Sequence, residues 1–491
     1  GCVGAKLIAG DGTIRHAGLV LGVGGTVSSP FARMPGDSDG YMQRLQVDQN
    51  YSALSGQCLM VRQALFAEVG GFDEELVPWA DVDLCLKLQR AGYLNVWTPR
   101  VQMLVGESGA VEVTPAQLDR LYQRWLPALA RDRAYNPNFS LENERTFRVG
   151  ESSLSWQPLS TFASIPSVLA HPAGEPDSVR HRIVQPFNAM RDTGALEGAL
   201  ANQVLSVVDV ERYNPDVVVF QQYVRAEQLE TMRQVKAFTQ SFKVFDLDLY
   251  LPNLSAKSPH YRQLPPDVLG ALRQGLSYMD RLVVSTDFMA QVFDGFNADI
   301  KIVKTRLDPL DWKELQGGRR RAGKPRVGWV GTLHSIGELE MLSNVIKELA
   351  SEVDWVILGA CPVHLRSFIR EYHDAVAIDE YPAKLASLDL DLALAPLEDN
   401  LFNRCKGNIR LLEFGACGVP VICSDIEAYR GDLPAKRVEN RFEAWVGAIR
   451  AHIQDLDAAA ALGDVLQARV RQDWMLDGAA LAVWRDSWLV H

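Results

Sequence analysis

Short apolar runs alternate with helical segments along the chain from about Ile183 to Cys423. Several of these runs are continuously apolar, which is typical of strands that are covered on both faces of a parallel sheet. The first part of this region predicts strands at 182–185, 216–220, 243–246, 281–285 and 301–303, with helices at 226–239 and 266–278. Strands and helices that alternate in this way predict the α/β class with a doubly wound sheet.

The same alternation starts again at about Lys324 and predicts a second sheet. Its strands are expected at 326–330, 355–358, 376–378, 390–395 and 419–423. Gly331 and Thr332 follow the first of these strands, where a glycine lets the backbone approach a phosphate and a threonine hydroxyl can donate to it. A tight turn explains a Gly-Thr pair equally well, so the pair alone leaves both interpretations open.

The stretch 402–430, FNRCKGNIRLLEFGACGVPVICSDIEAYR, is predicted to be a helix that leads into the last of these strands. Asn408 is a suitable N-cap. A helix that begins near Lys406 would carry Lys406, Arg410 and Glu413 on one face. That face suits a nucleoside diphosphate, because a lysine and a helix N-terminus attract pyrophosphate and a carboxylate accepts ribose hydroxyls. A solvated helix with i,i+3 and i,i+4 ion pairs is the alternative.

This stretch resembles the donor-binding segment of the GT-B glycosyltransferases of family 4. The matching residues are Phe402, Asn403, Lys406, Asn408, Glu413, Phe414, Gly418, Pro420 and Val421. The residues Gly328, Trp329, Gly331, Thr332 and His334 resemble a second element of that family. Glu413 corresponds to the second glutamate of the family's E-x7-E element, whereas the first glutamate would fall at Cys405.

The resemblance implies a retaining glycosyltransferase that needs no obligatory metal or cofactor and takes a UDP- or GDP-sugar as its donor. It gives Lys406 and Glu413 catalytic roles. The residues expected to contact the donor nucleotide are Gly331, Thr332, His334, Arg404, Lys406, Asn408, Arg410 and Glu413. The absence of the family's first glutamate at Cys405 leaves an alternative function open, a catalytically weak nucleotide-binding or scaffold module of a polysaccharide-assembly protein.

Two aspartates mark the expected acceptor side. Asp246 and Asp248 lie at the carboxyl end of the strand predicted at 243–246, at the edge where open α/β sheets bind ligands. In the resembling family this domain is on the acceptor side, so both carboxylates are expected to hydrogen-bond acceptor hydroxyls. A loop acid or helix cap is the alternative for each.

Residues 1–150 follow a different pattern, with a strand expected at 5–9, a hairpin turn at Asp11-Gly12 and a returning strand at 13–21. This segment resembles the C-terminal half of family 2 glycosyltransferases, which have the GT-A fold. The matching stretches are 3–7, 11–18, 55–62, 69–74, 81–93 and 135–140. The resemblance implies that the nucleotide-binding half, with its D-x-D metal site, lies upstream. The family's histidine ahead of Glu107-Ser108 is missing, so no metal ligand is expected there.

Asp81 matches the general base of family 2, which would deprotonate an acceptor hydroxyl. A first-turn acid is the alternative, because Asp81 and Asp83 precede an amphipathic run and would be stabilised by the helix dipole. Without a donor half, we expect Asp81 to be a vestigial base and this segment not to act as an independent transferase.

Four parts are therefore predicted. They are a partial GT-A-like domain at 1–150, a linker rich in Ser, Pro and Gly at 151–178, and a GT-B architecture of two Rossmann-like domains at 179–322 and 323–491. The resemblance also implies that a terminal helix, expected at 466–489, crosses back to the first GT-B domain.

Composition limits the partners. The formal charge of -11 provides no basic surplus for nucleic acid, and no run of about 18 apolar residues predicts a membrane span. The seven cysteines form no CxxC pair or zinc spacing, and their odd number is typical of a reducing cytosol. We expect a cytoplasmic protein that binds a nucleotide sugar and a glycan, lipid-linked or protein acceptor. Peripheral association with the inner face of the membrane and the oligomeric state are left open.

Overall fold

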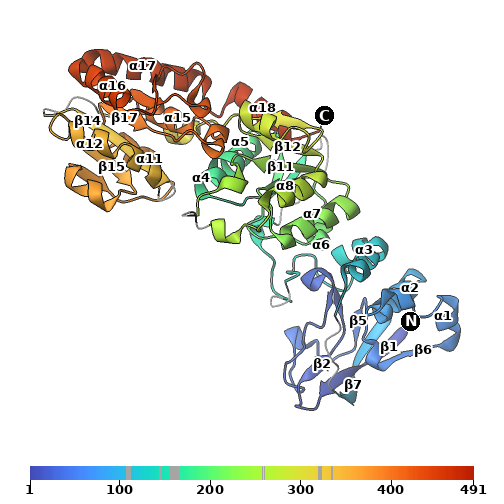
Figure 1. Ribbon diagram of the computed structural model, residues 1–491. Coiled ribbons are helices and arrows are strands. Elements are labelled where there is room, and N and C mark those ends of the chain that lie inside the picture. The colour runs from blue at the N-terminus through green and yellow to red at the C-terminus, as the bar shows by residue number, and fades with distance from the viewer. Residues whose placement is uncertain are drawn as a thin grey trace. The chain divides into compact units, whose positions relative to one another are not determined.

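The structure of the protein is a computed structural model that describes residues 1–106, 112–142, 146–154, 165–256, 258, 260–318, 323–332 and 335–490. The chain divides into two compact units (Figure 1). Unit 1 comprises 1–162, 203–216 and 230–241, and unit 2 comprises 163–202, 217–229 and 242–491.

Unit 1 is built around a mixed sheet with the strand order β2-β1-β7-β5, in which β6 also pairs with β1. The two longest strands, β1 and β7, run parallel to each other, and the short strands pair with them antiparallel. The strands are β1 Cys2–Ala9, β2 Ile14–His16, β5 Gln49–Tyr51, β6 Leu59–Val61 and β7 Asn95–Val105. The strand predicted at 5–9 is confirmed by β1, whereas the predicted returning strand is split into β2 and β3 (Val20–Leu21).

One hydrophobic core holds unit 1 together. It contains Trp97 of β7, Leu84 and Leu88 of α2, and Trp125 of α3. The helices of this unit are α1 Gln63–Glu68, α2 Ala80–Arg90, α3 Pro115–Ala130, α6 Val207–Tyr213 and the second half of α7 Ala226–Phe238. The leucines predicted to form the apolar face of α2 are buried, which confirms the amphipathic pattern of that helix.

The first sheet of unit 2 has six parallel strands in the order β13-β12-β11-β10-β8-β9. The strand order reverses between β8 and β10, which makes the sheet doubly wound. The strands are β8 Ser167–His171, β9 Glu197–Leu200, β10 Val217–Gln221, β11 Phe242–Leu247, β12 Arg281–Val284 and β13 Ile300–Ile302. The helices are α4 Pro176–Val179, α5 Gln185–Asp192, α8 Val268–Ser277, α9 Asp287–Val292 and α10 Pro309–Trp312.

The second sheet of unit 2 is also parallel and six-stranded, with the order β16-β15-β14-β17-β18-β19. Its strands are β14 Arg326–Gly331, β15 Asp354–Gly359, β16 Glu371–His373, β17 Leu392–Ala395, β18 Val421–Ser424 and β19 Lys436–Val438. Its helices are α11 Ile336–Met341, α12 Ser343–Leu349, α13 Tyr381–Ala386, α14 Leu401–Cys405, α15 Ile409–Ala416, α16 Phe442–Gln454, α17 Leu456–Asp473 and α18 Gly478–Trp488. The two Rossmann-like sheets confirm the predicted α/β class.

Close packing fixes α15, the helix on which the predicted nucleotide site depends. Gly415 faces α17, and a Cβ atom at this position would lie 2.8 Å from Cγ of Leu466. A side chain there would force the two helices apart.

Three sequence predictions in unit 2 are wrong. Residues 182–185 are helical, and the apolar pair Ile183-Val184 explains why they looked like part of a core strand. No strand forms at 376–378, because β15 pairs instead with the polar residues of β16. The linker prediction for 151–178 fails in its second half, since it contains β8 and the start of α4. Pro166 and Pro172 flank β8 and gave this stretch the composition of a linker.

The predicted terminal helix is interrupted, and its last part packs on the first sheet. The segment 474–477 separates α17 from α18. Trp484 and Trp488 of α18 lie in one buried cluster with Phe187 of α5 and Val219 of β10. These tryptophans are packing residues, with ring centroids 5.7 Å apart in an edge-to-face arrangement.

We predict that His171, the last residue of β8, makes unit 2 sensitive to acid. Burial lowers the pKa of His171 to about 4 from the usual 6.5, so the unfolded chain binds a proton that the folded state does not. Stability is therefore lost as the pH falls from 6.5 toward 4. Between pH 7 and pH 5 this group should cost about 2 kcal/mol.

Urea denaturation at the two pH values measures this loss. In His171→Phe the loss should be smaller by about 2 kcal/mol, whereas the exposed His364→Phe should behave as the wild type. A pH dependence that does not change in His171→Phe would contradict the prediction.

Candidate functional site

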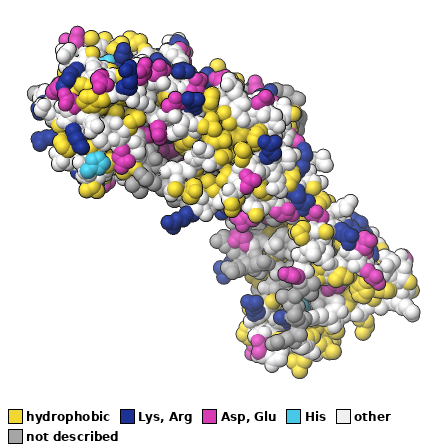
Figure 2. Space-filling model, viewed as in Figure 1, with side chains coloured by type: hydrophobic (Ala, Val, Ile, Leu, Met, Phe, Trp, Pro, Cys, Tyr) yellow, Lys and Arg dark blue, Asp and Glu magenta, His cyan; other side chains and the backbone are white. Residues whose placement is uncertain are grey.

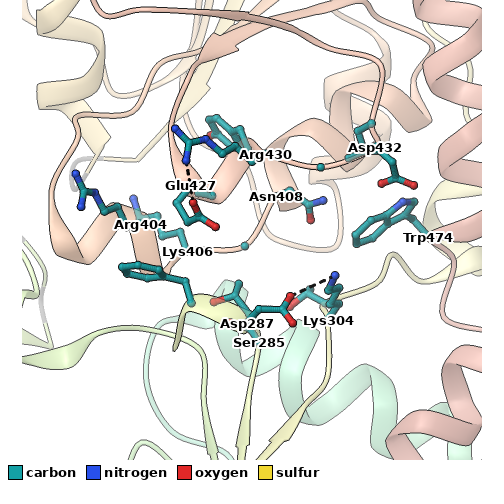
Figure 3. A pocket seen from close by; sticks show the side chains of 18 residues that line it. Ser285, Asp287, Lys304, Arg404, Lys406, Asn408, Glu427, Arg430, Asp432 and Trp474 are labelled. Atoms are coloured by element: carbon teal, nitrogen blue, oxygen red, sulfur yellow. Dashed lines mark hydrogen bonds and ion pairs between the residues drawn. The ribbon is translucent and has the colours of Figure 1, made fainter. Parts of the chain in front are cut away.

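A pocket of about 700 Å³, partly open to solvent, lies between the two Rossmann-like sheets of unit 2 (Figure 3). The first sheet contributes Asp287 after β12 and Lys304 after β13. The second sheet contributes Lys406 and Asn408 between α14 and α15, and the segment 427–433 after β18. The carboxyl ends of strands from both sheets thus meet at the pocket, which is where open α/β sheets bind ligands.

Ion pairs line the pocket on both sides. Nζ of Lys304 lies 3.5 Å from the Asp287 carboxylate, and the guanidinium of Arg430 lies 3.2 Å from Glu427 (Figure 3). The four side chains are between 42% and 68% exposed. Because exposed ion pairs contribute little stability, these side chains can exchange partners when a charged ligand enters.

Lys406 lies outside the helix that carries Glu413. Helix α14 ends at Cys405, Lys406 caps it, and α15 begins only at Ile409. The prediction that one helix face carries Lys406, Arg410 and Glu413 is therefore wrong. The sequence contains a signal for the break, because Gly407 is a poor helix former and the N-cap Asn408 places the start of α15 after Lys406.

The charge of Lys406 is balanced by a residue that the sequence did not single out. Nζ of Lys406 lies 3.1 Å from Oε1 of Glu338 in α11, and it also lies 5.0 Å from the ring centroid of Phe402. Both charged side chains are only partly exposed. This ion pair connects the α14–α15 junction to α11, the helix that follows Gly331 and Thr332 in the sequence.

Asn408 is the N-cap of α15, as predicted. Its side chain makes no capping hydrogen bond and lines the middle of the pocket (Figure 3). The first amide groups of a helix lack intrahelical acceptors and carry a partial positive charge. The N-terminus of α15 is therefore suited to bind an anionic group in this pocket.

Arg404 also lines the pocket, but Asp399 already binds its guanidinium. Nε and Nη2 of Arg404 donate to the two carboxylate oxygens at 2.6 and 2.9 Å. The pair holds the pKa of the Asp399 carboxyl below its usual value. A donor contact by Arg404 would have to compete with this two-point interaction.

Glu413 is buried and forms a cluster with the half-buried side chains of Arg410 and Tyr381, the latter from α13, and neither Glu413 nor Arg410 is among the residues that line the pocket. Oε2 of Glu413 accepts hydrogen bonds from Tyr381 at 3.0 Å and from Arg410 at 2.8 Å. Arg410 also donates to the Tyr381 hydroxyl at 2.6 Å. Burial raises the pKa of the Glu413 carboxyl, although the guanidinium of Arg410 opposes that effect. The i,i+3 ion pair of the alternative interpretation exists, with Glu413 buried and Arg410 partly exposed.

The sequence predicts both Gly331 and Thr332 after the strand, whereas in the structure Gly331 is the last residue of β14 and Thr332 follows it. Gly331 packs tightly, because a Cβ atom there would lie 2.3 Å from the indole of Trp329. His334 lies outside the described residues, as do Glu107 and Ser108. Gly331 and Thr332 are not among the residues that line the pocket.

Cys405 is fully buried, and its backbone carbonyl accepts a hydrogen bond from Thr286 at 3.2 Å. Burial raises the pKa of its thiol to about 11. All seven cysteines are described and free, and Cys58 alone among them is half-buried rather than buried. The Cys405 side chain therefore does not replace the glutamate of the resembling family.

Asp246 is a core residue and not an accessible acid. Both of its oxygens are bound by Arg182, at 3.0 and 2.9 Å, and both side chains are fully buried. Burial raises the pKa of the Asp246 carboxyl to about 6 against the effect of Arg182. The structure thus contradicts the expectation that Asp246 faces an acceptor.

Asp248 is more accessible than Asp246 and belongs to a polar network at the edge of the first sheet. Its Oδ1 accepts hydrogen bonds from Ser178 and Gln222, both at 2.7 Å. Gln222 also lines a second pocket, of about 570 Å³, together with Glu175 and His260. Sequence reasoning missed this pocket, because the misassigned strand β8 leads directly into its wall at 173–175.

Asp81 lies in the first turn of α2, in unit 1. Its two oxygens accept hydrogen bonds from the backbone N–H groups of Gly56 at 2.7 Å and Val82 at 2.8 Å. Burial raises the pKa of this carboxyl. These contacts are those of the first-turn acid that the sequence offered as the alternative to a general base.

Among the described residues, no three His, Cys, Asp or Glu side chains are arranged to hold a metal ion. No helix in the described part of the chain is both long and apolar enough to cross a membrane.

No protein-family model matches the chain. Over 153 residues it is 43% identical to the uncharacterized protein y4gI of Sinorhizobium fredii, a match that covers 29% of this chain and 17% of that protein. Over 148 residues it is 32% identical to the O-antigen biosynthesis protein RfbC of Myxococcus xanthus, covering 29% and 12%. Over 124 residues it is 32% identical to an N-acetylglucosaminyl-diphospho-decaprenol L-rhamnosyltransferase of Mycobacterium tuberculosis, covering 24% and 40%. The chain spans less than half the length of each of these relatives.

Solved structures with similarity to the chain include a sucrose-phosphate synthase from Thermosynechococcus elongatus, with a TM-score of 0.46 and 11% identity over 65% of this chain and 97% of that one. Another is HepE of Anabaena in complex with UDP and glucose, with a TM-score of 0.44 and 13% identity over 65% and 97%. The fold of unit 2 rests on its own strand order rather than on these scores.

Proposed function

We propose that the chain is a glycosyltransferase whose unit 2 moves a sugar from a nucleotide-sugar donor to a glycan or surface-protein acceptor. The observation that carries the proposal is the pocket between two Rossmann-like sheets, in which Lys406 and the N-terminus of α15 come together. This arrangement suits a ligand that carries a diphosphate at one end and an uncharged group at the other.

The chemistry of transfer explains why such a pocket is needed. When the bond between the anomeric carbon and the phosphate breaks, negative charge builds up on the leaving diphosphate. Lys406 and the first amides of α15 would stabilise that charge without an obligatory metal. Lys406 would exchange its contact with Glu338 for one with the phosphate. By its resemblance to family 4, the reaction is expected to retain the anomeric configuration.

The sugar of the donor would contact carboxylates other than the family's first glutamate. Cys405 is buried, whereas Asp287, Glu427 and Asp432 all line the pocket. A carboxylate oxygen accepts hydrogen bonds from sugar hydroxyls. We therefore assign the sugar contact to this group of acids.

The acceptor would bind in the second pocket, at the carboxyl edge of the first sheet. This pocket combines polar groups of Glu175, Gln222 and His260 with an apolar wall that includes Leu251 and Leu254. Hydroxyl-rich rings need both kinds of contact. Asp248 adjoins the pocket through Gln222, whereas Asp246 does not take part.

The relatives and the surface agree with a role in polysaccharide assembly. RfbC of M. xanthus is an O-antigen biosynthesis protein, and the M. tuberculosis relative is a rhamnosyltransferase. On the face shown in Figure 2, the described basic and acidic side chains are interspersed rather than gathered by sign. Such a surface offers no continuous basic patch for a nucleic acid on that face.

Replacing Lys406 by alanine should weaken the binding of UDP or GDP, whichever the wild type prefers, by about tenfold, because one charge-assisted contact to phosphate is lost. Isothermal titration calorimetry measures the effect. Lys347→Ala removes an exposed lysine of the same domain and should leave the affinity unchanged. Equal affinities of Lys406→Ala and the wild type would show that the diphosphate does not bind at this junction.

A transfer assay separates the enzyme from the binding-module alternative. The full chain, incubated with UDP- and GDP-sugars and with oligosaccharide acceptors, should release nucleoside diphosphate, and a chelator should leave the rate unchanged. Binding of a nucleotide without any release of diphosphate would instead support a catalytically weak module. Loss of the rate with the chelator would contradict charge stabilisation by Lys406 and α15 alone.

A further inference from the structure

We propose that Tyr381 is a positioning residue that presents Glu413 to the ribose of the donor nucleotide. The proposal rests on the proposed function and on the sequence-based expectation that Glu413 accepts the ribose hydroxyls, since Glu413 lies on α15, whose N-terminus is at the pocket. Tyr381 lies 32 positions before Glu413 in the sequence, and no motif identified from the sequence includes it.

The hydroxyl of Tyr381 connects both members of the buried ion pair. It donates to Oε2 of Glu413 at 3.0 Å and accepts from Nη1 of Arg410 at 2.6 Å. The same nitrogen of Arg410 donates to Oε2 at 2.8 Å. The Tyr381 hydroxyl, Nη1 of Arg410 and Oε2 of Glu413 are therefore all hydrogen-bonded to one another, and only one oxygen of the carboxylate takes part. No hydrogen bond to Oε1 occurs among the described residues, so Oε1 is the oxygen left for a ligand.

The ring of Tyr381 is anchored from the opposite side. It meets the indole of Trp312 edge to face, with centroids 6.0 Å apart and an interplanar angle of 68°. Trp312 lies in α10 and is 1% exposed. Because Tyr381 begins α13 and packs against a fixed indole, its hydroxyl has a defined position relative to α15. Burial also raises the pKa of Tyr381 well above its usual value, so the hydroxyl remains a donor at neutral pH.

A fixed orientation of the Glu413 carboxylate matters because it has to accept hydrogen bonds from two adjacent ribose hydroxyls at the same time. Without the Tyr381 hydroxyl, Arg410 would hold Glu413 alone and could bind either oxygen. The carboxylate would then lose its single orientation, and a geometry that is 1 Å too loose is enough to weaken a site. The contact most affected would be the one to the 2′-hydroxyl and 3′-hydroxyl pair of the ribose.

The test compares a ribonucleotide with its deoxy analogue. Calorimetry on the full chain would measure UDP against 2′-deoxy-UDP, or GDP against 2′-deoxy-GDP if the wild type prefers GDP. The wild type should prefer the ribonucleotide. In Tyr381→Phe, affinity for the ribonucleotide should fall about five- to tenfold while affinity for the deoxynucleotide changes little, so that the preference shrinks.

The matched control is Tyr372→Phe, which removes a tyrosine hydroxyl from β16 in the second sheet of unit 2. This variant should bind the ribonucleotide and the deoxynucleotide with unchanged affinities. A purely structural role of Tyr381 would lower both affinities by the same factor, and that result would overturn the proposal. An unchanged preference in Tyr381→Phe would overturn it as well.

Glu413→Gln separates this proposal from the proposed function. If Glu413→Gln loses the preference and Tyr381→Phe keeps it, Glu413 binds ribose but Tyr381 does not position it. If Glu413→Gln binds both nucleotides as the wild type does, the ribose lies elsewhere, and the assignment of Glu413 fails together with the role of Tyr381.

Discussion

Two backbone hydrogen bonds join the places where the chain passes between the sheets of unit 2. The N–H of Leu307 donates to the carbonyl of Trp474 at 3.0 Å, and the N–H of Leu476 donates to the carbonyl of Leu307 at 2.8 Å. One crossing follows β13, and the other separates α17 from α18. Because these bonds tie the two crossings together, the sheets are held with a pocket between them. Trp474, beside the second crossing, is itself part of the pocket wall.

Buried charges give unit 2 much of its internal order. Arg182 and Asp246 pair inside the first domain, and Arg410 and Glu413 pair inside the second. A buried pair is costly to desolvate, and removing one partner leaves the other charge uncompensated. The two pairs differ in their surroundings, because Arg182 also lies over the ring of Trp484, whereas Glu413 keeps one oxygen without a described partner. The Arg182–Asp246 pair therefore supports the packing of α18, whereas the Arg410–Glu413 pair can bind a ligand.

The sequence predicted those parts of the fold that are determined by the hydrophobic pattern within a single strand or helix. Strand β17 is continuously apolar and β10 is apolar up to its last residue, Gln221, so the burial of both could be inferred from the pattern alone. Strand β8 escaped because it is short and lies between prolines, and β16 escaped because its three residues, Glu371–His373, are polar or only partly buried. These strands are specified by their neighbours in the sheet, which a linear pattern does not contain.

The candidate site was predictable to the same extent. Asn408 as an N-cap followed from local signals, and Lys406 as a candidate for binding the diphosphate followed from its charge and from the resemblance, although the loop that carries Lys406 was not predicted. Glu338 and Tyr381 come from other helices than the residues of the predicted site. Glu338 lies 68 positions before Lys406 in the sequence, and no spacing rule connects either residue to the site. The break between α14 and α15 was missed although Gly407 and the N-cap Asn408 mark it, because Lys406 was placed on the helix of Glu413 from spacing alone.

The burial of Cys405 has a practical consequence for labelling this protein. Its thiol lies beside the pocket but is inaccessible and resists deprotonation, so alkylating reagents will not reach the site through it. Five further cysteines are buried as well, and Cys58 is the half-buried one. A thiol-reactive dye should therefore attach to unit 1 at Cys58 without any substitution and leave the pocket of unit 2 chemically untouched. The natural sequence thus already provides a single attachment point for a spectroscopic probe.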